Sequence, residues 1–478
     1  MSAVDTASRE AAGEGQGRAS AARPPDMPAD WGLTPLGLLM ELGGLLSLVV
    51  GGLFIMIGMM ASLVEGAAGL LFALFGASAI VRSELHRRAG RGLIYGNPRG
   101  AMRPLKVYIA FALVHSLVAP ALVLPLASDA FAATSMAKTG IALFVWLACW
   151  PAAVMLLARR TPFWRRENDA EALPASEDNG YEGLAVLMTV FGSFGAVIAC
   201  AAAFSMIASG VGGHLLVGIP LAGLLAYRAA RHLGVGIAGV RGVGGSEFEE
   251  RGMRYSNAAI VIAFLVSAAT LLAFVMLSAE ASPHAIVFPF ALFWLLFVWP
   301  RIVGQFLNTR GFAQLMGGGS PLSRSPDLAL TALGWLLLAA GVLPLAGAAT
   351  SLLGLSYSDL GGFDAAGFAM DTQGGSPLPQ LVAGAAQVWA GAELVGMTRR
   401  CRRAALVYGA VGISAAIYEG WDHLVLMSDL GVSSLTPSGA LPAMGALLVF
   451  VPMLILPIAT IALTRRRGAQ EARVVSGA

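Results

Sequence analysis

Long, nearly uncharged apolar runs are the feature of this sequence that most restricts its fold. A bilayer core about 30 Å thick is crossed by a helix of about twenty apolar residues, and the chain contains many runs of that length. Hydrophobic residues make up 57% of the 478 residues and charged residues only 12%, whereas a soluble domain carries about 25% charge. The sequence therefore predicts an all-α, polytopic membrane protein.

Two landmarks recur three times, in the same order. The first is the basic stretch RRAGRGL at 87–93, which is matched in register by RHLGVGI at 231–237 and loosely by RRAALVY at 402–408. The second is a proline in an apolar run that is followed eight to ten residues later by arginine, at Trp150-Pro151, Trp299-Pro300 and Leu456-Pro457. This periodicity predicts three internal repeats of one membrane unit.

Each repeat is predicted to hold four transmembrane helices, about twelve in all. The predicted helices are 36–60, 67–88, 105–127 and 139–160 in the first unit, 182–207, 212–233, 256–278 and 284–308 in the second, and 327–352, 379–400, 404–427 and 441–463 in the third. The units cover 34–164, 181–312 and 326–467, between a disordered tail over 1–33 and a short tail over 468–478. An even number of helices per unit makes the repeats parallel, which allows pseudo-threefold symmetry about the membrane normal.

The basic residues predict the orientation. Of the 31 lysines and arginines, Lys138 alone is assigned to the far side, Arg301 lies within a helix, and the others lie in the tails, in alternate loops or at the helix ends beside them. Positive charge marks the cytosolic side, so we expect a multi-pass protein of the inner (plasma) membrane with both termini in the cytosol. The arginine stretches anchor helix ends and attract anionic lipid head groups. A basic funnel for an anionic ligand is the alternative.

Three ionisable residues fall inside the predicted hydrocarbon region, where an unpaired charge costs several kcal/mol. Glu41, Arg301 and Glu393 all fall in the cytosolic half, within about 10 Å of one another in depth at about 1.5 Å per residue. We expect them to form an intramembrane polar cluster. The cluster is an ion pair that fixes how the units dock or a site that couples a proton or substrate, and the third alternative is that the residues are unpaired and snorkel towards the membrane surface.

A second polar group is predicted on the far side. Glu419, Asp422 and His423 share one face of a predicted helix, and His214 and His284 begin helices on that side. Carboxylates and imidazoles on one face can bind a divalent metal. No metalloprotease motif is present, and nothing in the sequence brings the other two histidines close, so we expect an interfacial polar cluster without a metal.

Other features are read as packing. Small residues at Gly43-Gly44 and Gly51-Gly52 predict a stripe of close helix contact. His115, in the middle of a predicted helix, is interpreted as a hydrogen-bonded packing residue, with proton relay as the alternative. Three separated cysteines, Cys149, Cys200 and Cys401, predict inert thiols rather than disulfides.

The sequence carries no catalytic signature. It has no nucleophile elbow, P-loop, dinucleotide turn or paired catalytic carboxylates, so we predict that the chain is not an enzyme and has no cofactor. Its basic residues form no single patch, which argues against nucleic acid, and the expected partners are the lipid bilayer and anionic head groups. We favour a permease-like protein with a polar path between the repeats. A structural, sensory or assembly component is the alternative, and a membrane-embedded enzyme working at Glu419, Asp422 and His423 ranks third.

Overall fold

The structure is a computed structural model of the whole chain. It describes residues 32–95, 98–125, 133–158, 180–208, 212–241, 245–277, 284–317, 326–352, 377–398, 400–429, 451 and 453–466. The tails predicted over 1–33 and 468–478, the linkers and the long loop near 354–377 lie almost entirely outside the described residues.

The described residues are almost all helical. The helices are α2 (Thr34–Glu65), α3 (Ala67–Tyr95), α4 (Pro98–Val123), α5 (Ala133–Leu157), α7 (Tyr181–Ala208), α8 (Gly212–Arg241), α9 (Gly245–Leu277), α10 (His284–Gly317), α11 (Pro326–Leu352), α12 (Pro377–Val395) and α13 (Cys401–Asp429). Residues 453–466 are helical as well. The all-α prediction is therefore confirmed for the part of the chain that the structure describes.

Eight of the described helices are long and apolar enough to cross a bilayer: α2, α3, α4, α5, α7, α9, α10 and α11. The chain is accordingly a multi-pass membrane protein. The other four predicted spans, which correspond to α8, α12, α13 and the helix that includes 453–466, stay predictions.

Several helices run past their predicted ends. The basic stretch at 87–93 lies inside α3, which continues to Tyr95, and α4 begins at Pro98. Arginine, alanine and leucine are good helix formers, and Arg87 and Arg88 both pair with Glu84 one turn earlier on the same helix. The predicted loop is therefore mostly helix. The third basic stretch is placed differently again, because Arg402 lies at the start of α13, whereas 87–93 and 231–237 lie within α3 and α8.

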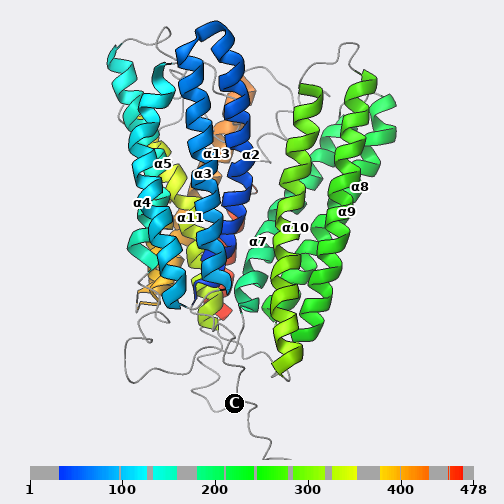
Figure 1. Cartoon of the computed structure of the whole chain (residues 1–478). Coiled ribbons are helices and arrows are strands. Elements are labelled where there is room, and N and C mark those ends of the chain that lie inside the picture. Colours follow the sequence, from blue (N-terminus) through cyan, green and yellow to red (C-terminus); the bar gives the residue numbers. More distant parts are fainter. Residues whose placement is uncertain are drawn as a thin grey trace, which may run out of the picture.

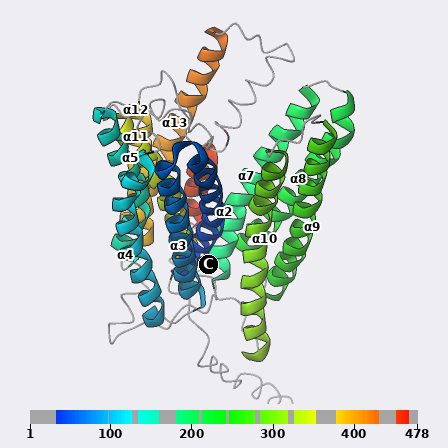
Figure 2. The same ribbon diagram turned by 45° about the horizontal axis from the view of Figure 1, so that its top comes forward.

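The helices pack in three groups along the sequence. Figure 1 shows α2–α5 on one side of the molecule and α7–α10 on the other, and Figure 2 shows the same two groups after rotation. Within each group, the first helix packs on the second and the second on the third. The first helices of the three groups, α2, α7 and α11, contact one another, while α5 contacts α11 and α10 contacts α2.

Helices α2 and α3 are connected by a tight turn at Gly66, where φ is 55°. The two helices pack against each other along a seam of small residues. The residues at closest approach recur every seven positions: Gly37, Gly44, Gly51 and Gly58 on α2, and Gly69, Gly76, Ser83 and Gly90 on α3. A Cβ atom at Gly58 would lie 2.4 Å from the backbone nitrogen of Ala73. A seven-residue period is that of a left-handed supercoiled pair, so two backbones approach more closely here than side chains would permit.

The predicted glycine stripe holds for three of its four glycines. Gly44 and Gly51 lie in the seam, but Gly43 faces the His86 ring, and a Cβ atom at Gly52 would have no described neighbour within 4 Å. Gly43 and Gly44 therefore both lie against α3, whereas Gly52 points about 100° away from Gly51.

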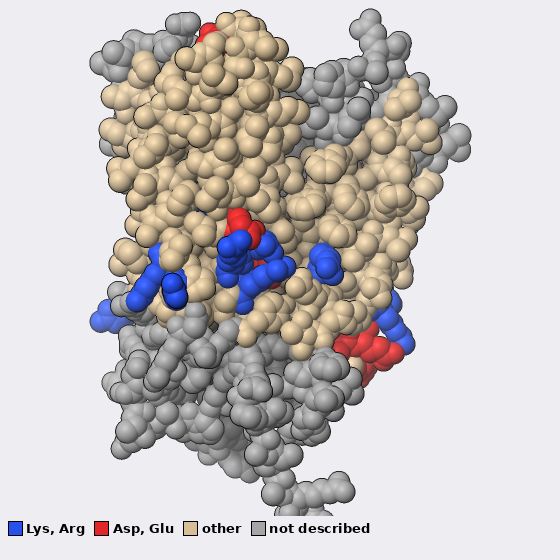
Figure 3. Space-filling view, viewed as in Figure 1, with Lys and Arg blue, Asp and Glu red and all other residues tan. Residues whose placement is uncertain are grey.

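The centre of the molecule is apolar. Where the first helices meet, Leu184, Leu187, Leu333 and Leu337 are each fully buried and belong to one hydrophobic cluster with Leu38. The outer surface is apolar as well, with exposed side chains such as Leu63, Phe264 and Leu272. Figure 3 shows the visible Lys and Arg side chains gathered in the lower part of this surface, below a wide uncharged belt. We call the lower end, where α3 ends and α4 begins, the charged end.

Candidate functional site

The predicted cluster of Glu41, Arg301 and Glu393 does not form. Glu41 is 1% exposed and accepts a hydrogen bond from Arg91 Nε at 2.8 Å. The side chain of Arg301 is exposed, and Glu393 accepts hydrogen bonds from Trp389 and Thr398 near it in sequence.

The close packing of α2 on α3 explains this correction. A Cβ atom at Gly90 would lie 2.8 Å from the backbone nitrogen of Glu41, so the next residue, Arg91, is beside the carboxylate. Arg91 also reaches Gln305 Oε1 on α10, at 3.5 Å. The buried acid is therefore paired with an arginine that was expected in a loop.

The predicted far-side group is described only in part. Glu419 is buried and accepts a hydrogen bond from Gln380 Nε2 at 3.2 Å. The side chains of Asp422, His423, His214 and His284 lie outside the described residues. Among the side chains that are described, no three His, Cys, Asp or Glu residues are placed to hold a metal ion.

A different polar cluster lies inside the first group of helices. We call Arg82, His86, Tyr108, His115 and Trp150, from α3, α4 and α5, the first cluster. Trp150 Nε1 donates to His86 Nε2 at 3.2 Å, and the His86 ring stacks on Tyr108 with centroids 4.6 Å apart. Arg82 lies beside Tyr108, and its Nη1 is 3.3 Å from His115 Nδ1. Three helices are thus joined through one set of polar side chains.

The second group of helices contains nearly the same arrangement. We call Arg228, His232, Tyr255 and Trp299, from α8, α9 and α10, the second cluster. Trp299 Nε1 donates to His232 Nε2 at 2.8 Å, and the His232 ring stacks on Tyr255 with centroids 4.6 Å apart. Arginine precedes histidine by four residues in both clusters, which places the two side chains on one face of the helix.

Each arginine is fixed by the carbonyl that a proline leaves unpaired. Proline has no N–H, so the carbonyl four residues before it loses its helical partner. For Pro151 that carbonyl belongs to Leu147, which accepts from Arg82 Nη2 at 2.6 Å. For Pro300 it belongs to Leu296, which accepts from Arg228 Nη2 at 2.6 Å. The proline landmark and the arginine are therefore two halves of one local structure.

The two clusters correct the register inferred from the sequence. His86 occupies the position of His232, so Arg87 corresponds to Leu233 and not to Arg231. The glycine contacts support the same alignment, because a Cβ atom at Gly44 would contact Arg87 and one at Gly192 would contact Leu233. The sequence pattern that gives the correct alignment is Arg-x-x-x-His followed further along by Trp-Pro. The basic stretch alone shifts the alignment of the two groups by two residues.

The third group of helices has little of this arrangement. A Cβ atom at Gly391 of α12 would contact Gly334 and Leu338 of α11, just as one at Gly90 of α3 would contact Gly37 and Glu41 of α2. This match aligns Gln387 with His86 and Ala383 with Arg82. Leu456 stands before Pro457, where the other groups have tryptophan before the proline, and α13 carries a tyrosine, Tyr408.

No family model, curated protein or solved structure matches this chain. A function therefore has to be inferred from the geometry of the two clusters.

Proposed function

We propose that this multi-pass membrane protein is permease-like and that its substrate-facing groups are the two arginine clusters inside the first and second groups of helices. This places the polar path within a group rather than between groups.

The observation that carries the proposal is a guanidinium at mid-helix without a carboxylate. Arg82 is the sixteenth of the 29 residues of α3, and Arg228 is the seventeenth of the 30 residues of α8. The ion pairs found in the described part of the chain involve neither arginine. Charged side chains within a membrane are rare and usually mark a ligand or ion pathway. Neutral carbonyl and imidazole partners leave the charge available to an anion.

A path between the groups has less support. The residues where α2, α7 and α11 meet are large and apolar, and Leu333 and Leu337 are fully buried. A hydrated path needs polar lining groups. Between the groups, the polar set of Glu41, Arg91 and Gln305 lies near the charged end, whereas the two clusters lie at mid-helix.

We also infer that the three groups are copies of one four-helix unit, twelve spans in all. The matching clusters and the recurring order of helix contacts support this triplication. The contacts of α5 with α11 and of α10 with α2 fit a cyclic arrangement, in which residues 453–466 would lie against α7. In this view the third copy has lost the arginine and histidine and keeps a structural role.

The remaining expectations are part of the same proposal. The positive-inside rule supports cytosolic termini and an inner-membrane location, with anionic lipid heads bound at the arginines of the charged end. We propose no enzymatic activity.

A non-transport structural or assembly role is the second candidate, because the tight glycine seam and the apolar centre suit a rigid scaffold. Accessibility to thiol reagents separates the two readings. The test uses a variant in which Cys149, Cys200 and Cys401 are alanine, reconstituted in liposomes, with either His115→Cys or Leu337→Cys added.

If the path lies within the first group, a small anionic methanethiosulfonate should modify cysteine at 115 and leave cysteine at 337 unmodified. Modification of cysteine at 337 alone would instead support a path between the groups. Protection of both positions would favour the scaffold role.

A further inference from the structure

Arg301 is a cation without a partner in the part of the chain that the structure describes. Its side chain is exposed, and the ion pairs found there all involve other residues. It lies inside the candidate membrane span Pro289–Thr309. A charge in that region is costly unless an opposite charge or the polar head-group layer reaches it. Arg301 therefore needs an anionic or polar group from outside the described residues.

Aromatic rings continue from Arg301 along one face of α10. Residues four, seven and eleven positions apart share a helical face, and counting back from Arg301 these are Phe297, Trp294 and Phe290. The rings of Trp294 and Phe297 have centroids 6.3 Å apart. None of the three side chains is fully buried. We call Phe290, Trp294 and Phe297 the aromatic stripe.

The aromatic stripe runs beside the first group of helices. Trp294 Nε1 donates to the Leu45 carbonyl of α2 at 2.8 Å. Gln305, one turn beyond Arg301 on the same helix, contacts Arg91 of α3 at 3.5 Å. The face of α10 that carries the stripe and Arg301 thus lies at the junction of the first and second groups.

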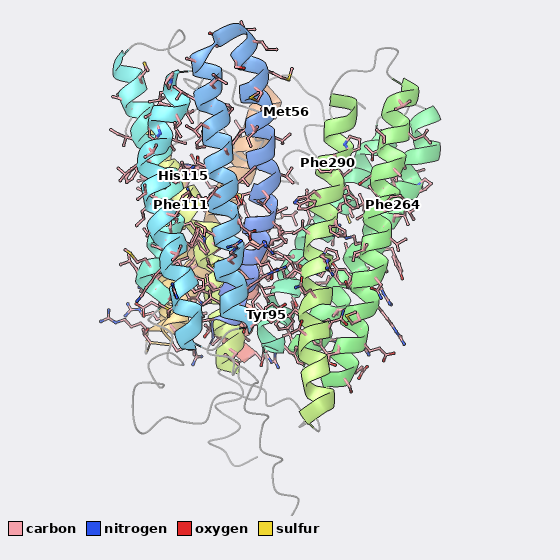
Figure 4. The ribbon with its side chains drawn as sticks, viewed as in Figure 1. Met56, Tyr95, Phe111, His115, Phe264 and Phe290 are labelled. Carbon is pink, nitrogen blue, oxygen red and sulfur yellow. The ribbon has the colours of Figure 1, made fainter. Side chains whose placement is uncertain are left out.

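The junction is open beyond the contact of Trp294 with Leu45. A Cβ atom at Gly52, seven residues after Leu45 and on the same side of α2, would have no described neighbour within 4 Å. Met56 and Phe290 are both exposed, and Figure 4 shows them on α2 and α10. An apolar surface that two helices line in this way suits a hydrocarbon chain.

Positive charge is in excess at the end of the stripe nearest the charged end. Four arginines of α3 and α10 lie there: Arg87, Arg88, Arg91 and Arg301. Two carboxylates, Glu41 and Glu84, pair with the three arginines of α3, which leaves an excess of two positive charges. Figure 3 shows charged side chains over the lower parts of α3 and α10. Such a basic site attracts an anionic lipid head.

The aromatic stripe also has the length of one lipid leaflet. From Arg301 to Phe290 the helix rises about 16 Å, at about 1.5 Å per residue. Half of a hydrocarbon core about 30 Å thick is about 15 Å. An acyl chain whose head group lies at Arg301 would therefore end near Phe290.

We propose that one anionic phospholipid, from the leaflet at the charged end, binds at the junction of the first and second groups. Its phosphate lies on Arg301 and one acyl chain lies along the aromatic stripe. The inference rests on the lipid binding that is part of the proposed function and assigns it one defined site. It does not depend on transport.

The test is native mass spectrometry of the full-length protein in detergent, titrated with long-chain phosphatidylglycerol. Phosphatidylcholine with the same chains has no net charge, and glycerol phosphate has the head group without the chains. We expect an adduct of one phosphatidylglycerol per chain, at lipid concentrations where phosphatidylcholine gives much less. Glycerol phosphate should not displace it. Equal adducts of the two lipids, or displacement by glycerol phosphate, would overturn the proposal.

Arg301→Gln should weaken binding of this phosphatidylglycerol at least about tenfold, because a contact between guanidinium and phosphate is charge-assisted. Arg254→Gln is the matched control, since Arg254 is an exposed arginine of α9 that pairs with Glu250, and it should leave binding unchanged. Unchanged binding by Arg301→Gln would overturn the proposal. Equal weakening by both variants would overturn it too, because lipid heads would then bind the arginines without a defined site.

The position of the acyl chain is tested with phosphatidylglycerol whose chains carry bromine, which quenches nearby tryptophan fluorescence. At one lipid per chain, the quenched part of the fluorescence should be smaller in Trp294→Phe than in the parent. An equal quenched part in both would place the chain elsewhere and overturn the proposal. These outcomes are separate from the accessibility of cysteine at 115, so the permease reading and the lipid site can fail independently.

Discussion

At the scale of single residues, Glu41 is a buried carboxylate whose ion-pair partner is Arg91, with Arg87 also close enough to interact with its charge. Its side chain is 1% exposed, while the paired Arg91 is 39% exposed and bridges α2, α3 and α10. Removing one member of a desolvated pair leaves an uncompensated charge, which is worse than removing both. The pair therefore joins the first and second groups of helices near the charged end.

We expect Arg91→Gln to destabilise the protein by less than the range of about 3–5 kcal/mol found for broken fully buried pairs, because the Arg91 side chain is 39% exposed and Arg87 also lies near Glu41. The measurement is the unfolding free energy in mixed detergent. Arg88→Gln is the matched control, because Arg88 lies on the same helix with a side chain that is 68% exposed. The double variant Glu41→Gln/Arg91→Gln should recover part of the loss, and an Arg91→Gln variant as stable as Arg88→Gln would show that the pair contributes nothing.

The sequence predicted the burial of Glu41 but not its partner. Ending the helix at Arg88 put Arg91 in a loop, since no apolar run continues past that point. Arg301 was expected inside the bundle because its neighbours are apolar. Those neighbours, Trp299 and Ile302, are indeed buried, but successive side chains on a helix point about 100° apart. Arg301 therefore points in a different direction from both neighbours, and its side chain is exposed.

At the scale of helices and helix pairs, two devices set the geometry: the glycine seam between α2 and α3, and the arginine that binds the carbonyl freed by a proline. Both bring backbone into contact with a partner from another helix. Neither depends on hydrophobicity, so neither is visible in a hydropathy profile.

The proline device predicts coupling between Arg82 and Pro151. In the parent, Arg82→Ala leaves the Leu147 carbonyl without a partner. In a Pro151→Ala background the restored N–H can bond that carbonyl, so the same arginine substitution should cost less. We expect a coupling of about 1 kcal/mol, the usual contribution of one hydrogen bond, measured by a double-mutant cycle of unfolding free energies. Equal losses in both backgrounds would mean that the carbonyl does not fix the arginine.

The glycine seam gives a second prediction at this scale. Gly58→Ala places a Cβ atom 2.4 Å from the backbone nitrogen of Ala73, so α2 and α3 must separate, whereas Gly52→Ala meets no described atom within 4 Å. Overpacking costs about 1–3 kcal/mol, while alanine at an open helical site is favoured over glycine by about 0.5–1 kcal/mol. Thermal unfolding in detergent should therefore show a lower melting temperature for Gly58→Ala and an unchanged or higher one for Gly52→Ala. The reverse order would place the seam elsewhere.

At the scale of the whole molecule, the hydropathy of the sequence was sufficient to predict an all-helical membrane protein. The helix ends were less predictable, because arginine-rich segments such as 87–93 remain helical beyond the apolar run. The residue-by-residue alignment of the first two groups depends on the matching geometry of the His86–Trp150 and His232–Trp299 hydrogen bonds. Sequence periodicity alone aligned arginines that do not correspond.

Orientation is the prediction that belongs to the molecule as a whole. In the variant without natural cysteines, Ser358→Cys, in the loop predicted on the far side, should react with a membrane-impermeant maleimide in intact cells. Ser323→Cys, in the linker predicted on the cytosolic side, should react only after the cells are opened. The opposite labelling pattern would reverse the orientation and remove the support for cytosolic termini.

The mid-helix position of Arg228 has a consequence for biosynthesis. Arginine at the centre of a membrane helix opposes insertion by about 2.5–3.5 kcal/mol, and α8 also carries Arg231 and His232. Helix α8 packs against α7, which is synthesised just before it, so we expect the two helices to enter the membrane as a hairpin. The carbonyl that binds Arg228 belongs to α10, which is made later. Between those two moments the nascent chain holds an unsatisfied cation in the membrane, and this interval is when a chaperone or a lipid phosphate would have to shield it.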